Sequence, residues 1–169
     1  MSSPSVAIRP ARPEDMDRVL HVLTTAAEWA RHRGIERWWP SPFPENQIRP
    51  ALHRGELYVA ELSGEIVGTF ILRWDDPSDW GVQPPIAGYL HALAVRKDRP
   101  LSGVGRELIA WAVQKTRAEG RHKLRLGCLE TNSALVSHYR SIGFVPLRVV
   151  PSSVAGEDRG TLLMEMEIR

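Results

Sequence analysis

The sequence predicts a mixed α/β fold, in which one layered sheet carries helices on its faces. The first observation behind this prediction is the order of elements that the hydrophobic periodicity indicates, which is β-α-α-β-β-β-α-β-α-β-β. The second is the length of 169 residues, which suits one domain with a sizeable core, and we expect residues 1–169 to form that single domain. The composition, with 43% hydrophobic and 25% charged residues, is ordinary for a globular protein.

Charge and composition exclude several classes of protein. The formal net charge is only +2, so bulk charge does not indicate nucleic-acid binding. One cysteine excludes an internal disulfide and fits a reducing compartment, and the first residues lack the apolar region of a signal peptide. No apolar stretch could span a bilayer, and no clustered His and Cys residues form a metal-ligand set. We therefore expect a cytoplasmic monomer or homodimer that needs no metal and has neither nucleic acid nor membrane as a partner.

The first half of the chain is expected to hold two helices and three strands. Acidic residues that suit a helix N-terminus follow Pro13, and apolar residues then recur at helical spacing as far as Gly34. A Leu-Ser-Gly-Glu sequence between two apolar runs is a hairpin signal. The expected elements are a strand over 6–9, a helix over 13–34, a short helix over about 45–54, and strands over 57–61 and 66–74.

Two segments of this half allow both a structural and a functional interpretation. Trp38, Trp39 and Phe43 stand among three prolines, which forbid a regular helix. Their rings either pack over the core or form a rigid lid beside a binding cleft. Residues 75–79 carry three carboxylates, lack the spacing of a calcium loop and are expected to form a solvated loop. The alternative is an acidic rim that attracts a cationic amine.

The second half alternates strands with helices. The apolar run over 87–95 is expected to form the central buried strand, followed by a helix over 103–117 that ends before Gly120. Cys128 lies inside the next apolar strand, where a thiol is more often a small core residue than a nucleophile. The remaining elements are strands over 124–129, 144–150 and 161–168, a helix over 132–143, and a polar hairpin loop over 154–160.

A glycine-bearing turn leads from the central strand into the helix that follows it. Gly103 and Gly105 open that helix, whose first N–H groups have no partner within the helix and attract anions. Glycine lets an anion approach the backbone because no Cβ intervenes. The turn lacks the third glycine of a Rossmann fingerprint and the Gly-Lys-Ser/Thr of a P-loop. Alone, it fits either a phosphate site or an ordinary tight turn.

A second segment strengthens the functional interpretation of this turn. Asn132 opens a later helix and is expected to cap it. Tyr139 follows seven residues later, which is two helical turns, so both side chains share one face. That face can point at one end of a ligand whose phosphates lie on the preceding helix.

These two blocks resemble the GNAT-type N-acetyltransferase superfamily. The first runs from Leu93-Ala-Val to Gly103-Val-Gly-Arg-Glu-Leu, and the second, more specific block runs from Asn132 through Tyr139 to Gly143-Phe144. The front half, with Trp74-Asp-Asp-Pro among its motifs, is similar to a subgroup of uncharacterised bacterial acetyltransferases. The resemblance covers nearly the whole chain in element order. It implies a single mixed, mostly antiparallel central sheet with helices on both faces.

The resemblance also implies a cosubstrate and roles for particular residues. Acetyl-CoA would donate an acetyl group to a primary amine of a small molecule, Asn132 would hydrogen-bond the pantetheine arm, and Tyr139 would protonate the departing thiolate. Pro100 stands where the family usually has Arg or Gln, so the loop is poorer in charge than usual. Backbone pairing with pantetheine is implied for Leu93, Ala94 and Val95, and pyrophosphate binding for Leu101, Ser102, Gly103, Val104, Gly105 and Arg106.

Direct attack in a ternary complex requires a neutral amine, a stabilised oxyanion and an acid for the leaving thiolate. The base is expected to be His91 or Glu130. Strand alternation places His91 on the side of Leu93 and Val95, although a structural histidine and a surface glutamate remain alternatives.

Two other functions remain open, which are a protein or peptide N-acetyltransferase and a non-catalytic CoA-binding sensor. Acceptor contacts are expected at Trp38, Trp39, Phe43, Trp74 and Asp75.

Overall fold

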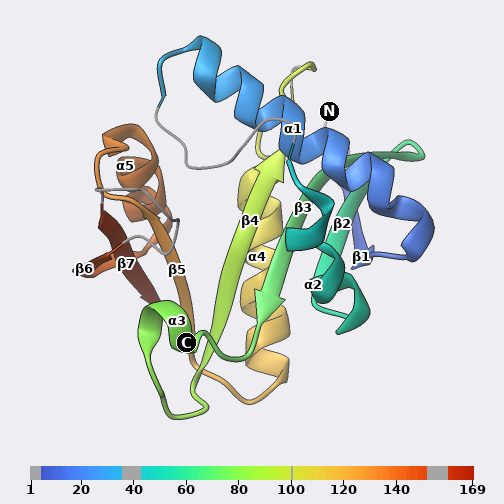
Figure 1. The fold of residues 1–169 in the computed structure, drawn as a ribbon. Helices are drawn as coiled ribbons and strands as arrows, with labels where there is room; N and C mark the ends of the chain where they lie inside the picture. The colour runs from blue at the N-terminus through green and yellow to red at the C-terminus, as the bar shows by residue number, and fades with distance from the viewer. Residues whose placement is uncertain (1–4, 36–42, 100, 152–159) are drawn as a thin grey trace.

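A computed structural model describes residues 5–35, 43–99, 101–151 and 160–169 of the chain. Its strands form one sheet in the order β1-β2-β3-β4-β5-β7-β6 (Figure 1). Every neighbouring pair is antiparallel except β4 and β5, which run parallel. The predicted mixed, mostly antiparallel sheet is therefore confirmed. The strands are β1 (Ala7–Pro10), β2 (Leu57–Leu62), β3 (Glu65–Arg73), β4 (Ala87–Val95), β5 (Lys123–Leu129), β6 (Val145–Pro151) and β7 (Gly160–Glu167).

Helices lie on both faces of the sheet, as predicted (Figure 1). The α4 and α5 face buries Leu108 and Tyr139 in one cluster with Phe70 of β3. The α1 and α2 face buries Leu23 with Ile71 of β3 in a second cluster. No helix among the described residues has the length and apolar character needed to cross a membrane. The helices are η1 (Pro13–Asp15), α1 (Met16–His32), η2 (Glu45–Gln47), α2 (Arg49–His53), α3 (Pro77–Trp80), α4 (Val104–Ala118) and α5 (Ser133–Ile142).

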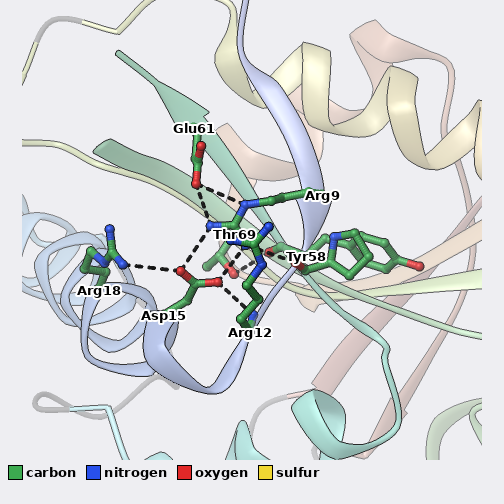
Figure 2. Close-up of polar contacts among 8 residues, drawn as sticks. Arg9, Arg12, Asp15, Arg18, Tyr58, Glu61 and Thr69 are labelled. Carbon is green, nitrogen blue, oxygen red and sulfur yellow. Dashed lines mark hydrogen bonds and ion pairs between the residues drawn. The ribbon is translucent and has the colours of Figure 1, made fainter. Parts of the chain in front are cut away.

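An ionic network around the buried Asp15 carboxylate joins the start of α1 to the edge of the sheet (Figure 2). Asp15 Oδ2 lies 2.7 Å from Arg9 Nη1 and accepts a hydrogen bond of 2.7 Å from the Arg12 N–H. Arg9 also contacts Glu61 of β2 at 2.5 Å. The hydrogen bond from Arg9 outweighs burial and holds the pKa of Asp15 below its ordinary value. The network therefore links β1, β2 and the start of α1 through the Arg9 guanidinium, which bridges the carboxylates of Asp15 and Glu61.

The segment over residues 75–79 differs from the expected solvated loop. Pro77–Trp80 forms the short helix α3, and the Asp76 side chain is buried. The Trp80 ring packs edge-on against Tyr89 at 5.9 Å, with the Arg125 guanidinium 4.7 Å from its centroid. These contacts come from β4 and β5, so residues distant in sequence hold the acidic segment against the sheet.

An irregularity in β4 changes the side on which His91 lies. Thr69 pairs with Ala94 and Ile71 pairs with His91, so Phe70 faces two residues of β4, and Ala92 has a φ of +51°. Leu90, Leu93 and Val95 all pack into the cluster under α4. Because His91 directly follows Leu90, it points to the other face of the strand. The prediction that His91 shares a side with Leu93 and Val95 is therefore wrong, and the bulge is the reason.

The parallel strands β4 and β5 separate soon after they begin. Their register contains three residue pairs, from Ala87↔Lys123 to Tyr89↔Arg125, although β4 continues to Val95 and β5 to Leu129. Figure 1 shows the two strands diverging toward their carboxyl ends. Beyond Tyr89, the edge of β4 that faces β5 has no strand partner in the part of the chain that the structure describes. The pairing of the sheet is thus interrupted at its centre, and we call this interruption between β4 and β5 the opening.

Candidate active site

The opening between β4 and β5 presents unpaired backbone. The other edge of β4 is paired with β3 as far as Val95, so among the described residues it is the edge toward β5 that lacks a strand partner and could take a ligand. The side chains of Leu93 and Val95 pack toward α4, and Ala94 packs toward α1. An extended ligand arm could therefore add to β4 as a strand adds to a sheet edge, through N–H and C=O groups alone.

The glycine turn lies at the carboxyl end of this opening. Gly103 is the residue before α4 and has a φ of +81°, which glycine adopts without strain. A Cβ placed at Gly105 would lie 3.9 Å from Val95 Cγ2, so the first turn of α4 packs beside the end of β4. Val104 is buried in the core, so only its backbone could contact a ligand. The dipole and first N–H groups of α4 make this end suitable for an anion.

Basic side chains gather near this turn. Arg106 Nη2 donates a hydrogen bond of 3.1 Å to Ser141 Oγ, which ties α4 to α5. Burial, followed by the positive charges of Arg106 and Lys97, lowers the pKa of His138. The Lys97 ammonium also lies 4.8 Å from the centroid of the Trp29 ring. The sequence did not identify Lys97 as a candidate, because the basic residues before Pro100 follow no characteristic spacing. The fold brings Lys97 close enough to α5 for its charge to act on His138.

Asn132 and Tyr139 both lie on the buried side of α5. Asn132 Oδ1 accepts a hydrogen bond of 3.1 Å from the Leu135 N–H, which confirms the predicted cap. The Tyr139 ring is 8% exposed and packs edge-on against Phe144 at 5.7 Å. The two residues therefore share a face, as their spacing predicted, and that face belongs to the α4 side of the sheet.

His91 meets two carboxyl groups of the α3 segment on the opposite side of the sheet. His91 Nε2 lies 3.2 Å from Asp76 Oδ2. Burial would raise the pKa of Asp76, but the contact with His91, the hydrogen bond from Ser78 and the positive charge of Arg73 hold it below its ordinary value. Burial and the negative charge of Asp76 raise the pKa of Asp79. Asp76 therefore loses its proton at a lower pH than Asp79 does.

Glu130, the second base predicted from the sequence, has a different environment. Its carboxylate accepts a hydrogen bond of 3.3 Å from the Gly160 N–H, and its own N–H donates to the Gly160 carbonyl at 3.1 Å. Glu130 is exposed and links the end of β5 to the start of β7. These contacts give Glu130 a structural role where β5 meets β7, whereas His91 lies on β4 just beyond the last β4–β5 pair.

The predicted acceptor contacts are scattered. Trp38 and Trp39 lie outside the described residues. Phe43 is buried in the core with α1 and α2, which favours the packing alternative over a lid. Trp74 packs toward α4, with the Arg121 guanidinium 5.2 Å from its ring centroid, whereas Asp75 is 82% exposed. Asp76 and Asp79, which the sequence offered only as members of the acidic segment 75–79, are the acidic residues nearer to His91.

Cys128 is a core residue, as the sequence predicted. Its Sγ lies 4.0 Å from Met164 Sδ inside the cluster under α4. Burial raises the pKa of the thiol to about 11, so the thiolate form is scarce at neutral pH. Among residues 5–35, 43–99, 101–151 and 160–169, no group of three or more His, Cys, Asp or Glu side chains is arranged to hold a metal ion.

Comparisons with known proteins agree with this arrangement. The model of the acetyltransferase (GNAT) family matches residues 39–144. The uncharacterized N-acetyltransferase YesJ of Bacillus subtilis strain 168 is 29% identical over 147 residues, with 80% of this chain and 79% of that protein covered. The crystal structure of a GNAT acetyltransferase from Listeria monocytogenes 4b F2365 gives a TM-score of 0.75 at 24% identity, covering 96% of this chain and 94% of that one. The structure of yncA from Salmonella typhimurium with its cofactor acetyl-CoA gives 0.70 at 16% identity, covering 98% and 95%.

Proposed function

The chain belongs to the acetyltransferase (GNAT) family, and on that premise we propose that it transfers the acetyl group of acetyl-CoA to a primary amine of a small molecule. The observation that carries this proposal is the separation of β4 and β5 after three residue pairs, with a glycine turn at the open end. The free edge of β4 and the first turn of α4 together fit an extended ligand that ends in phosphates.

Acetyl-CoA occupies this opening in the proposal. Its pantetheine arm pairs with the backbone of Leu93, Ala94 and Val95, and its pyrophosphate meets the turn formed by residues 101–106. Arg106 of the turn and Lys97, whose positive charges both lower the pKa of His138 of α5, compensate for the missing charge at position 100. Asn132 donates its side-chain amide to the arm while its Oδ1 caps α5.

The reaction is direct attack in a ternary complex. A backbone N–H of the free β4 edge stabilises the oxyanion, Tyr139 protonates the departing thiolate, and His91 accepts the proton of the amine. Tyr139 packs on the α4 side and His91 lies on the α1 side, so the acid and the base flank the opening from opposite faces. Holding both substrates in this geometry contributes several kcal/mol, on the order of what well-oriented reactants provide.

The choice of a small amine rests on the carboxyl groups of α3. Asp76 is buried beside His91, and Asp79 lies near Gly127 of β5, so both carboxyl groups approach the opening from the α1 side. Negative charge in this place attracts a cationic amine before it loses its proton.

The test is an acceptor screen that measures release of free CoA thiol from acetyl-CoA. Small primary amines are offered in parallel with peptides that carry a free amino terminus, and a reaction without acceptor measures hydrolysis. We expect at least one small amine to release thiol faster than every peptide. Faster turnover of peptides would favour a protein N-acetyltransferase, and binding of acetyl-CoA without turnover of any acceptor would favour a sensor.

A further inference from the structure

The contact between His91 and Asp76 has the geometry of an orienting pair. The Asp76 side chain is 2% exposed and its Oδ2 lies 3.2 Å from His91 Nε2. His91 Nε2 is itself buried and has no well-aligned hydrogen bond to another described group, although 30% of the side chain is exposed. The exposed part of the ring therefore lies away from Nε2, and the buried edge of the ring faces a carboxylate.

Asp76 is held in place through both its side chain and its backbone carbonyl. The Ser78 hydroxyl donates a hydrogen bond of 3.0 Å to Asp76 Oδ1, which leaves Oδ2 for His91. The Trp80 N–H donates to the Asp76 carbonyl at 2.9 Å, so the residue is also the start of α3. Trp80 in turn packs against Tyr89 and Arg125. The carboxylate is therefore held by Ser78 of α3, and α3 itself packs against β4 and β5 through Trp80.

The charges around His91 come from two elements packed against it. Asp76 and Asp79 face it from α3, and Arg73 of β3 acts on Asp76. A neutral imidazole carries one N–H and one lone pair, and a carboxylate that only accepts hydrogen bonds selects the form with the N–H on its own side. The carboxylate at Nε2 therefore selects the form in which the lone pair lies on Nδ1.

We propose, on the basis of the acetyl transfer described above, that Asp76 is a positioning residue: it holds the Nε2–H of His91 so that Nδ1 accepts the proton of the acceptor amine. The amine lone pair attacks the thioester carbonyl carbon, the C–N bond forms and the C–S bond breaks. The amine proton passes to His91 Nδ1, and the Tyr139 hydroxyl proton passes to the departing sulfur. Water then takes the proton from His91 and returns one to Tyr139, which leaves amide and CoA thiol as products.

The first test reads the imidazole directly and needs no acceptor. In the ¹⁵N-labelled full chain, the nitrogen shifts of neutral His91 should show the proton on Nε2. In Asp76→Asn, Ser78 still donates to the amide oxygen, so the amide NH₂ faces the ring and the proton moves to Nδ1. A wild-type ring protonated on Nδ1 would overturn the proposal without any variant, and so would an unchanged form in Asp76→Asn.

The second test is a single-turnover cycle with an amine found in the acceptor screen. Asp76→Asn and His91→Gln should each slow acetyl transfer by roughly a hundredfold, the usual size of general-base assistance, and the double variant should be no slower than His91→Gln. Binding of acetyl-CoA, followed by calorimetry, should stay unchanged in all three. Asp17→Asn is the control, since Asp17 is an exposed aspartate of α1 that takes no part in the proposed site.

The outcomes separate this inference from the proposed function. Losses that multiply in the double variant, or an Asp76→Asn rate equal to that of Asp17→Asn, would contradict the role of Asp76. Failure to find any acceptor would count against the proposed function, while the imidazole spectrum would still decide whether Asp76 orients His91.

Discussion

The sheet differs on the two sides of β4. On the β3 side, pairing extends from Gly68↔Val95 to Arg73↔Tyr89 and is interrupted only by the bulge. On the β5 side, it stops after Tyr89↔Arg125. The β1–β3 half is further fixed by the Arg9–Asp15–Glu61 network, whereas the opening is bordered by a glycine turn and by His91 paired with the buried carboxylate of Asp76.

This difference separates stability from function within one sheet. Where neighbouring strands satisfy each other's backbone groups, the ladder and the packing against α1 stabilise the fold. Where a parallel pair separates, backbone groups remain for a ligand. Substitutions in the β1–β3 half should therefore change the free energy of unfolding with little effect on catalysis, and substitutions around the opening should do the reverse.

The largest expected effect is on cofactor binding at the glycine turn. Gly103→Glu adds a carboxylate where the pyrophosphate is proposed to bind, and should weaken acetyl-CoA affinity at least a hundredfold in calorimetric titration. Gly120→Glu is the matched control, because Gly120 also has a positive φ, of +75°, and lies after the other end of α4. Equal affinities in the two variants would place the phosphates elsewhere.

The second prediction concerns the acid on the α4 side. Tyr139→Phe removes only the hydroxyl and should slow single-turnover acetyl transfer by roughly a hundredfold, while acetyl-CoA affinity changes little. Tyr58→Phe removes the hydroxyl of a second buried tyrosine in the same cluster, on β2, and should leave the rate unchanged. If Tyr139→Phe reacts at the wild-type rate, Tyr139 has only a packing role.

The third prediction concerns the Arg9–Asp15 ion pair in the β1–β3 half. Asp15→Asn should lower the free energy of unfolding by about 1–3 kcal/mol at neutral pH, because Arg9 loses a buried charged partner. The folded pKa of Asp15 lies below its unfolded value of 3.8, so this stabilisation is complete above that value and disappears as the pH falls through the folded pKa. Urea titrations at several pH values test it, with exposed Asp17→Asn as control. A difference that persists in strong acid would contradict the assignment to this charge.

The smallest effect is expected at Cys128. Cys128→Ala should leave acetyl transfer within about twofold of wild type and cost about 1 kcal/mol of stability, because the side chain only fills the core. A native thiol with a pKa raised to about 11 should also react with iodoacetamide far more slowly than in the unfolded chain. Loss of turnover in Cys128→Ala would point to a covalent acyl-enzyme instead of direct attack.

The order of elements was predictable because each of the longer helices and strands carries its own hydrophobic period. The αL turn at Gly103 and the cap at Asn132 were also predictable, since each depends on a local residue preference. Helix α3 is too short for periodicity to detect, although Asp76 followed by Pro77 is a helix-start signal that could have identified it. Its burial depends on Trp80 meeting side chains from β4 and β5.

The side of β4 on which His91 lies could not be obtained from alternation. The positive φ occurs at Ala92, and alanine has no preference for that conformation, so the sequence contains no signal for the bulge. One bulge reverses the side of every residue before it relative to those after it. The pairing of His91 with Asp76 is likewise a consequence of how α3 packs.

The central claim is that the free edge of β4 binds the cofactor, and hydrogen exchange tests it most directly. Exchange is followed by mass spectrometry with and without saturating acetyl-CoA, comparing segment 90–95 of β4 with segment 57–62 of β2. We predict slower exchange in segment 90–95 on binding, because its amides gain ligand partners, and no change in segment 57–62. Binding of acetyl-CoA that leaves exchange in segment 90–95 unchanged would contradict the account.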